Sequence, residues 1–230
     1  MQRREYFKLA SIGTCAITSG MSLGREPIER SGPPRFQIGL AAYSLRNYFS
    51  WNKGKPRTAA QDGPAMDMSA FINYCAVQGF DTAELTSYFF DPDGGDDYFR
   101  GLKHQAFVSG VTISGTAIGN NFTIGKGPQL DAEIAQAKLW IDRAAVLGAP
   151  HIRFFAGTGK QLADDPMRLL EASEALNECA DHAAEKGVFL GVENHGGLTA
   201  KQMIQIMERA ESPWVGINLD TGNFISEDPY

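Results

Sequence analysis

Two strand-like segments, each ending in an acidic residue, constrain the fold of this chain more than any other feature. Residues 187–197 read GVFLGVENHGG, and residues 214–224 read WVGINLDTGNF. Between them, apolar residues recur at helical spacing over residues 198–210. A strand, a helix and a second strand in this order form a βαβ unit, which requires a parallel sheet.

Side chains alternate between the two faces of a strand, so each segment can be divided into faces. Glu193 and His195 share one face of the first strand, and Asp220 lies on the polar face of the second. The opposite faces carry apolar residues, namely Leu190 and Val192, then Val215, Ile217 and Leu219. An apolar face against helices and acidic groups at the carboxyl ends of parallel strands are typical of a (β/α) barrel, whose active site lies at those ends.

The rest of the chain repeats this alternation. Strand patterns begin near residues 37, 80, 111, 150, 188 and 214, and helical patterns separate them. No Gly-x-Gly-x-x-Gly follows the first of these strands, which disfavours a dinucleotide-binding fold. We therefore predict an α/β fold of the (β/α)8 TIM-barrel type over residues 36–230, with about six βα units. The first strand is expected over residues 36–45, followed by a long loop over 46–66 that is either an aromatic flap at the barrel mouth or a disordered surface loop.

Residues 1–35 are expected to form an export signal and a linker rather than part of the barrel. Arg3 and Arg4 precede a mildly apolar run, and the stretch RREYFK resembles a twin-arginine signal, with Tyr6 in the usual Phe position. This resemblance predicts an exported, periplasmic protein. The alternative is a frayed basic N-terminus on a cytoplasmic protein. The apolar run is too short and too polar for stable membrane insertion.

Composition limits the classes of partner. The net charge of −6 and the lack of a basic stripe give no basis for a nucleic-acid partner. Cys75 and Cys179 fall on predicted helices, where buried thiols are common, so no disulfide framework is expected.

Three motifs carry a family resemblance: GFDTAEL at 79–85, VENHGG at 192–197 and NLDTGNF at 218–224. Together they resemble the sugar phosphate isomerase/epimerase family, the xylose-isomerase-like TIM barrels. The resemblance implies a divalent metal at the barrel mouth (Mn²⁺, Mg²⁺, Co²⁺ or Zn²⁺), with Glu193 and Asp220 as two of its ligands. The family's further ligands, a His and a Glu after the seventh and eighth strands, have no counterpart, so the barrel is expected to be truncated after its sixth strand. Asn223 stands where the epimerase branch often has His.

The same resemblance implies roles for single residues. Glu193 would also carry the proton in a reaction that passes through an enediolate. His195, Glu84, Arg153 and Asn223 would bind the substrate, a small sugar or sugar derivative whose phosphorylation stays open. Alternatives are a solvated loop histidine for His195, a salt bridge within the barrel for Glu84 and Arg153, and structural roles for the two metal-ligand candidates. A homo-oligomer is compatible with the sequence.

Three functions compete on this sequence. The first is a divalent-metal-dependent sugar isomerase or epimerase, poorly active as the truncated chain. The second is a metal-dependent hydrolase or lyase on the same barrel, since a fold does not fix a function. The third is a non-catalytic barrel fragment, because an open barrel would expose two strand edges and apolar surface. The paired acidic strand ends favour the first.

Overall fold

The computed structural model describes residues 32–33, 36–57 and 65–223. The chain divides into two compact units, residues 1–33 and 34–230, and every helix and strand given below belongs to the second unit. The predicted export signal and linker lie outside the described residues, apart from residues 32 and 33. In the described part of the chain, none of the helices is both long and apolar enough to cross a membrane.

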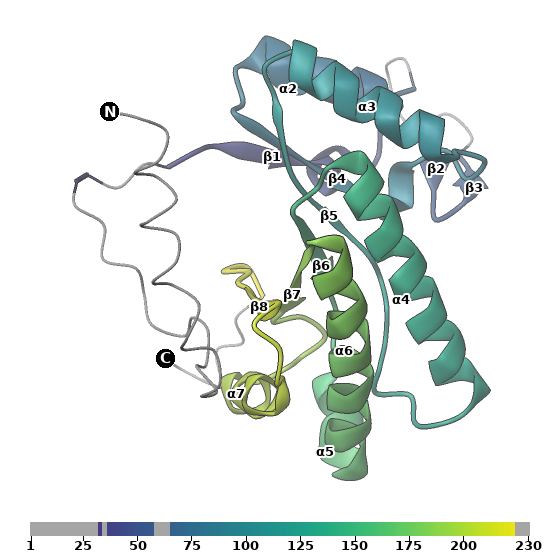
Figure 1. Cartoon of the computed structure of the whole chain (residues 1–230), viewed down its shortest axis with the longest axis vertical. Helices are drawn as coiled ribbons and strands as arrows, with labels where there is room; N and C mark the ends of the chain where they lie inside the picture. The colour runs from purple at the N-terminus through teal and green to yellow at the C-terminus, as the bar shows by residue number, and fades with distance from the viewer. Residues whose placement is uncertain (1–31, 34–35, 58–64, 224–230) are drawn as a thin grey trace, which may run out of the picture. The chain divides into compact units, whose positions relative to one another are not determined.

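Six strands form one parallel sheet in the order β1-β4-β5-β6-β7-β8 (Figure 1). Neighbours in this order are also successive βα units, as a barrel wall requires. This confirms the predicted six-unit fold class. The strands are β1 (Gly39–Ala41), β4 (Thr82–Thr86), β5 (Thr112–Ala117), β6 (His151–Phe154), β7 (Phe189–Glu193) and β8 (Val215–Asn218).

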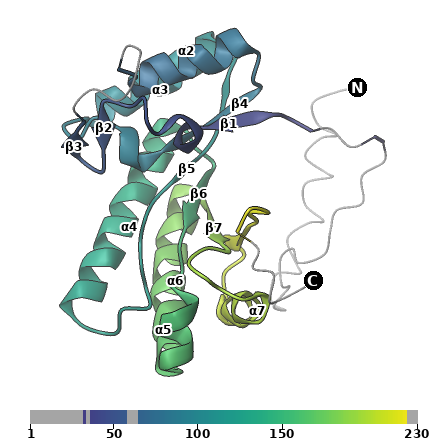
Figure 2. The same cartoon turned by 180° about the vertical axis from the view of Figure 1, so that it is seen from behind.

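Helices follow the strands and pack on one another along the sheet, as the two opposite views show (Figures 1 and 2). They are α2 (Met68–Gln78), α3 (Asp96–Val108), α4 (Pro128–Leu147), α5 (Gly159–Asp164), α6 (Met167–Lys186) and α7 (Ala200–Arg209). Local sequence sets their ends. The Asp67 side chain accepts the backbone N–H of Ala70 at 2.7 Å at the start of α2. Gly148 and Gly187 end α4 and α6 in the left-handed conformation, with φ of 78° and 69°.

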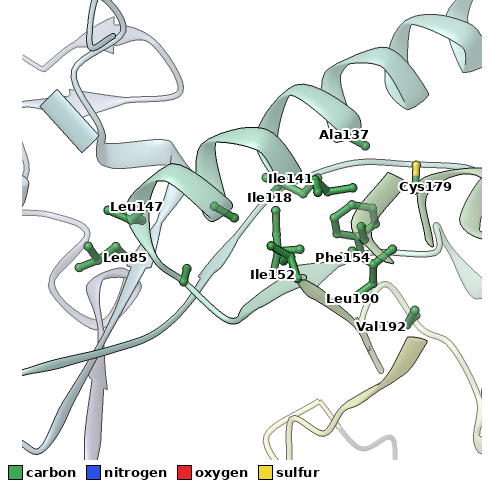
Figure 3. Packing of buried hydrophobic residues seen from close by; sticks show 14 of the residues in the cluster. Leu85, Ile118, Ala137, Ile141, Leu147, Ile152, Phe154, Cys179, Leu190 and Val192 are labelled. Carbon is green, nitrogen blue, oxygen red and sulfur yellow. The ribbon is translucent and has the colours of Figure 1, made fainter. Parts of the chain in front are cut away.

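The core lies between the helices and the apolar face of the sheet (Figure 3). Alternate residues of β6 and β7 point into it and meet α4 and α6. These side chains are Ile152, Phe154, Leu190 and Val192 from the strands, with Ile141, Leu147 and Cys179 from the helices. Cys75 and Cys179 are buried free thiols, as predicted, and burial raises the pKa of Cys179 to about 12. The opposite face of the strands is thereby left for polar side chains.

The first strand is shorter than predicted. β1 ends at Ala41, and residues 42–45 form a 3₁₀ turn, η1 (Ala42–Leu45), closed by a hydrogen bond from the Arg46 N–H to the Tyr43 carbonyl at 3.1 Å. The ring of Tyr43 packs edge-on against Tyr88 of η2 (Ser87–Phe89), with centroids 6.4 Å apart. The turn is therefore stabilised by an aromatic contact that strand periodicity cannot reveal.

The long segment after η1 is partly ordered. It contains a short hairpin of β2 (Trp51–Asn52) and β3 (Lys55–Pro56), and Phe49 is buried in a stack on Phe89 with centroids 4.4 Å apart. Residues 58–64 of the segment lie outside the described residues. The described part agrees with the flap alternative, because the hairpin is anchored to the core beside the mouth.

Both end strands of the sheet carry exposed apolar residues. Ile217 and Leu219, on and after β8, are 52% and 63% exposed, and Ile38, just before β1, is 67% exposed. The predicted exposure of apolar surface at the two sheet edges is therefore present in the described residues.

Candidate functional site

The two predicted acidic groups lie together at the carboxyl ends of β7 and β8. Glu193 pairs in register with Asn218, so Asp220 follows at the same edge of the sheet. The side-chain amide nitrogen of Asn223 donates to Glu193 Oε1 and to Asp220 Oδ2, at 2.8 Å in each case. Both carboxylates thus accept a hydrogen bond from the same side-chain nitrogen.

Asn194 fixes the backbone that carries Asp220. Its side-chain nitrogen donates to the Asp220 carbonyl at 2.8 Å, and its side-chain oxygen accepts the Asp220 N–H at 2.7 Å. The carboxylate itself accepts the Gly222 N–H at 2.7 Å, which orients it toward the mouth. Sequence reasoning did not single out Asn194. Its position directly after the predicted metal ligand was the available signal.

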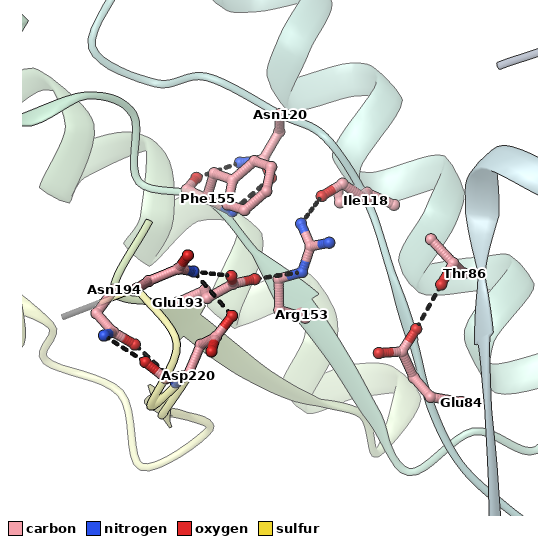
Figure 4. Close-up of polar contacts among 10 residues, drawn as sticks. Glu84, Thr86, Ile118, Asn120, Arg153, Phe155, Glu193, Asn194 and Asp220 are labelled. Atoms are coloured by element: carbon pink, nitrogen blue, oxygen red, sulfur yellow. Dashed lines mark hydrogen bonds and ion pairs between the residues drawn. The ribbon is translucent and has the colours of Figure 1, made fainter. Parts of the chain in front are cut away.

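Arg153, from β6, is the cationic partner of Glu193 (Figure 4). Its Nε lies 2.8 Å from Glu193 Oε2, and the two side chains are only 12% and 9% exposed. A second guanidinium nitrogen donates to the Ile118 carbonyl at 2.6 Å. The predicted alternative of a salt bridge within the barrel is therefore present for Arg153, whose partner is Glu193.

His195 lies flat against an aromatic ring that the sequence reasoning missed. Its imidazole stacks on Phe155 with centroids 4.3 Å apart, and the Arg153 guanidinium carbon lies 4.1 Å from the same ring centre. Asn120 holds the backbone of Phe155 from both sides, donating to its carbonyl at 2.7 Å and accepting its N–H at 2.9 Å (Figure 4). His195 lies in the loop after β7 and is exposed, so it agrees with the alternative of a solvated loop histidine, with one face of its ring on Phe155.

Glu84, at the end of β4, accepts the Thr86 hydroxyl at 2.7 Å. Burial raises its pKa, while the Thr86 hydrogen bond and the Arg153 charge oppose the shift. Burial also raises the pKa of Glu193. The charges of Arg153 and His195 oppose this rise, and the neighbouring Asp220 adds to it. Both carboxyls therefore hold a proton more readily than an exposed glutamate does.

One open cavity of about 880 Å³ brings these groups together. All six predicted site residues line it: Glu84, Arg153, Glu193, His195, Asp220 and Asn223. Its wall also includes three cationic side chains: Arg46 directly after η1, Lys53 in the hairpin turn, and Arg57 directly after β3. Sequence reasoning offered a flap at the mouth as one of two readings of this segment and did not assign its cations a role.

The carboxylates at the mouth supply part of a ligand set for a divalent cation. Two carboxylates that accept from one nitrogen at 2.8 Å could hold one cation in its place, and carboxylate oxygens are ligands that Mg²⁺ and Mn²⁺ prefer. The Asn223 amide occupies the point where positive charge is favoured. Within the described ranges, no cluster of three or more His, Cys, Asp or Glu forms a fuller set of ligands.

Comparison with known proteins identifies the architecture. Residues 72–230 match the model of a family described as xylose isomerase-like TIM barrels. A D-psicose 3-epimerase from Clostridium cellulolyticum H10, solved with D-tagatose, superposes with a TM-score of 0.65 at 20% identity, over 85% of this chain and 67% of that one. No curated protein sequence matches the chain closely enough to count as a relative.

Two further solved structures share the fold. A xylose isomerase-like TIM barrel protein from Mycobacterium smegmatis, in complex with magnesium, has a TM-score of 0.58 at 19% identity, over 81% of this chain and 65% of that one. A probable 3-DHS dehydratase from Bacillus anthracis has a TM-score of 0.57 at 17% identity, over 80% and 63%. The chain thus spans about two thirds of the length of these structures, and the likeness at such identities concerns the fold.

Proposed function

Because the chain belongs to the family of xylose isomerase-like TIM barrels, we propose that it carries the active site of a divalent-metal-dependent sugar isomerase or epimerase. The observation that carries the proposal is the convergence of Glu193 and Asp220 on one nitrogen of Asn223, at 2.8 Å from each. These two carboxylates would hold the metal after the Asn223 amide turns away. The substrate class is a sugar or sugar derivative with a carbonyl beside a hydroxyl-bearing carbon.

When bound, a divalent ion at this place would draw electron density from the carbonyl and hydroxyl oxygens of the sugar. Glu193 is the proton carrier in this proposal. Its carboxylate removes the proton from the carbon beside the carbonyl, the C–H electron pair forms a carbon–carbon double bond, and the carbonyl π electrons move onto oxygen. The product of this step is an enediolate of the sugar.

Return of the proton completes the reaction. Glu193 delivers it to the former carbonyl carbon, and a hydroxyl proton passes between the two sugar oxygens, which gives the isomer. An epimer forms instead when a proton reaches the original carbon from its opposite face. That outcome requires a second proton carrier, for which Glu84 lines the same cavity and has a raised pKa.

Charge around the cavity supports an anionic transition state. Arg153 lies 2.8 Å from the proton carrier, and Arg46, Lys53 and Arg57 line the wall of the same cavity. Fixed positive groups stabilise negative charge that develops on a bound substrate. The stacked His195 is available to donate or accept at a substrate hydroxyl.

Solvent exchange tests the proposed proton transfer. Incubation of the full chain with Mn²⁺ and a panel of ketoses and aldoses in D₂O should introduce deuterium beside the carbonyl, detected by proton NMR. Glu193→Gln should slow this exchange by about 10²–10⁴-fold, whereas Glu185→Gln, an exposed glutamate on α6, should leave it unchanged. Equal exchange in both variants would remove Glu193 from the mechanism.

Metal binding tests the ligand pair separately. Calorimetric titration with Mn²⁺ should give a defined affinity that is lost in the Glu193→Ala, Asp220→Ala double variant and kept in the Glu185→Ala, Asp181→Ala control, whose residues are exposed on α6. Equal Mn²⁺ affinity in the two double variants would show that the acidic strand ends are structural.

We also propose that residues 1–35 direct export, on the strength of the twin-arginine-like stretch alone. Periplasmic accumulation of the intact chain, and its loss when Arg3 and Arg4 are both changed to Lys, is the expected result. Unchanged fractionation of this variant would contradict export by that route.

A further inference from the structure

A second cavity, of about 360 Å³, lies beside the mouth cavity and shares two wall residues with it, Lys53 and Tyr88. Its volume is within the range of small-ligand pockets, which is roughly 300–1,000 Å³. Apart from the shared pair, it is formed by the hairpin turn, η2 and the residues after it, the residues directly after β5, and one side of α4. The site described above uses none of the α4 residues of this cavity.

The shared wall is an ordered feature. The Lys53 N–H donates to the Tyr88 carbonyl at 2.7 Å, and the Lys53 ammonium lies 4.6 Å from the centre of the Tyr88 ring. The Tyr88 hydroxyl lies against Gly119, where a Cβ atom would come within 2.4 Å of the hydroxyl oxygen. Gly119 therefore permits the tyrosine position that separates the two cavities.

The second cavity combines an aromatic surface with a polar rim. Trp140, half-buried on α4, stacks on Phe90 with centroids 5.8 Å apart, and Arg143 lies 4.6 Å from the centre of the Trp140 ring. Polar side chains complete the wall: Ser87, Asn120, Glu133 and Gln136. A sugar ring has the matching chemistry, since its C–H groups pack on apolar wall atoms and its hydroxyls both donate and accept hydrogen bonds.

Charge selects a neutral ligand for this cavity. The cationic groups in its wall, Lys53 and Arg143, are matched in number by the acidic groups Asp91 and Glu133. A phosphate or carboxylate on the ligand would meet both signs of charge there. An uncharged polyhydroxylated ring meets donors and acceptors without a net electrostatic penalty.

We propose that the cavity beside Trp140 is a second carbohydrate subsite, so that the substrate class is a disaccharide or glycoside rather than a single sugar. The reacting ring would occupy the mouth cavity near Glu193. The second ring would lie on the other side of Tyr88, in the cavity beside Trp140. The assignment of the reacting ring rests on the proposed function, whereas the binding of a second ring does not.

Two other lining residues of the second cavity connect it to the reacting groups. Ile118 and Asn120 line the second cavity, the Ile118 carbonyl accepts from Arg153, and Asn120 holds the backbone of Phe155. An occupant of the second subsite would therefore contact two residues that are hydrogen-bonded to Arg153 and Phe155, which lie beside Glu193 and His195.

Blocking the subsite tests the proposal. Gln136 is exposed on α4 and lines the cavity, so Gln136→Trp should fill it without disturbing the core. Gln129→Trp, at an exposed position of the same helix outside the cavity, is the matched control. The probes are methyl β-glucoside and fructose as single sugars, glucose 6-phosphate as a charged sugar, and cellobiose, maltose, lactose and sucrose as disaccharides. Each is titrated calorimetrically into the full chain with Mn²⁺ present.

We expect at least one disaccharide to bind ten times more tightly than the single sugars. Gln136→Trp should reduce that affinity to the single-sugar level and leave single-sugar binding unchanged, while Gln129→Trp should change neither. Equal affinities for all probes, no binding of any probe, or a loss of tight binding in the Gln129→Trp control would overturn the subsite. Tighter binding of glucose 6-phosphate than of every disaccharide, abolished by Gln136→Trp, would overturn the choice of a neutral ligand.

The two proposals fail separately. Tight disaccharide binding that depends on position 136, without deuterium exchange beside a carbonyl, supports the subsite and refutes the isomerase or epimerase. Deuterium exchange on single sugars, without any gain from a second ring, supports the isomerase or epimerase and refutes the subsite.

Discussion

Replacement of Arg153 by Met should destabilise the fold far more than the loss of an ordinary surface ion pair. Arg153 and Glu193 are 12% and 9% exposed, and their Nε and Oε2 atoms are 2.8 Å apart. Removing one partner of a buried pair leaves the other charge without compensation, which costs about 3–5 kcal/mol. The substitution also removes the donor to the Ile118 carbonyl, found at 2.6 Å.

A double-mutant cycle separates the charge from the other contacts. In a Glu193→Gln background Arg153 is itself the buried charge without a partner, so Arg153→Met should cost no more than about 1–2 kcal/mol there, for the Ile118 hydrogen bond and the Phe155 contact. The coupling between positions 153 and 193 is then about 2–3 kcal/mol. Urea unfolding followed by circular dichroism at pH 7, without metal, measures all four proteins.

Acid should reduce the difference between Arg153→Met and the unchanged protein, because a protonated Glu193 has no charge to compensate. Burial and Asp220 raise the pKa of this carboxyl while Arg153 lowers it, so loss of the arginine moves the pKa further upward. Arg100→Met is the control, since its ion pairs with Asp96 and Asp97 are exposed and should contribute under about 1 kcal/mol. Equal losses in Arg153→Met and Arg100→Met, or an Arg153→Met effect that Glu193→Gln does not reduce, would refute the reasoning.

Three further substitutions test other parts of the site by the same unfolding measurement. Burial raises the pKa of Glu84, so its ionised form opposes folding; Glu84→Gln should stabilise the protein at pH 7, and the gain should disappear as the pH falls below about 4.3, the ordinary glutamate value. A gain that is the same at every pH would contradict this. Asn120→Ala removes both partners of the Phe155 backbone and should cost about 1–3 kcal/mol, and an unchanged stability would show that water replaces them. Gly191→Ala places a Cβ atom 2.1 Å from the His151 ring nitrogen and should cost about 1–3 kcal/mol; most of the loss should vanish when His151→Ala is added, and a loss that persists would assign it to the backbone instead.

Local patterns predicted the parts of the fold that depend on local rules. Strand alternation placed Glu193 and Asp220 on the polar side because successive side chains of any strand point to opposite faces. Helix ends obey rules of the same local kind, since Asp67, Gly148 and Gly187 each satisfy or close the backbone of their own helix. These assignments need no knowledge of distant residues, and the structure confirms them.

Contacts between distant residues could not be predicted in the same way. Arg153 and Glu193 are forty positions apart in the sequence, so their ion pair depends on how β6 and β7 are aligned. Asn120 and Phe155 meet through backbone atoms, which no residue-type pattern identifies. The hairpin cations were missed because a loop of unknown conformation gives its side chains no predicted direction.

Two glycines on the polar face of the sheet make room for a histidine ring next to the site. The His151 ring lies over Gly115 and Gly191, where Cβ atoms would come within 2.9 Å and 2.1 Å of its nitrogens. Burial, and next to it the charge of Arg153, lower the pKa of His151, which favours the neutral ring. Arg153, two residues further along β6, then meets Glu193, two residues beyond Gly191 on β7. A larger residue at 191 would displace the His151 ring, so the glycine that looks unremarkable in the strand pattern is required for the histidine to lie on this face of the sheet.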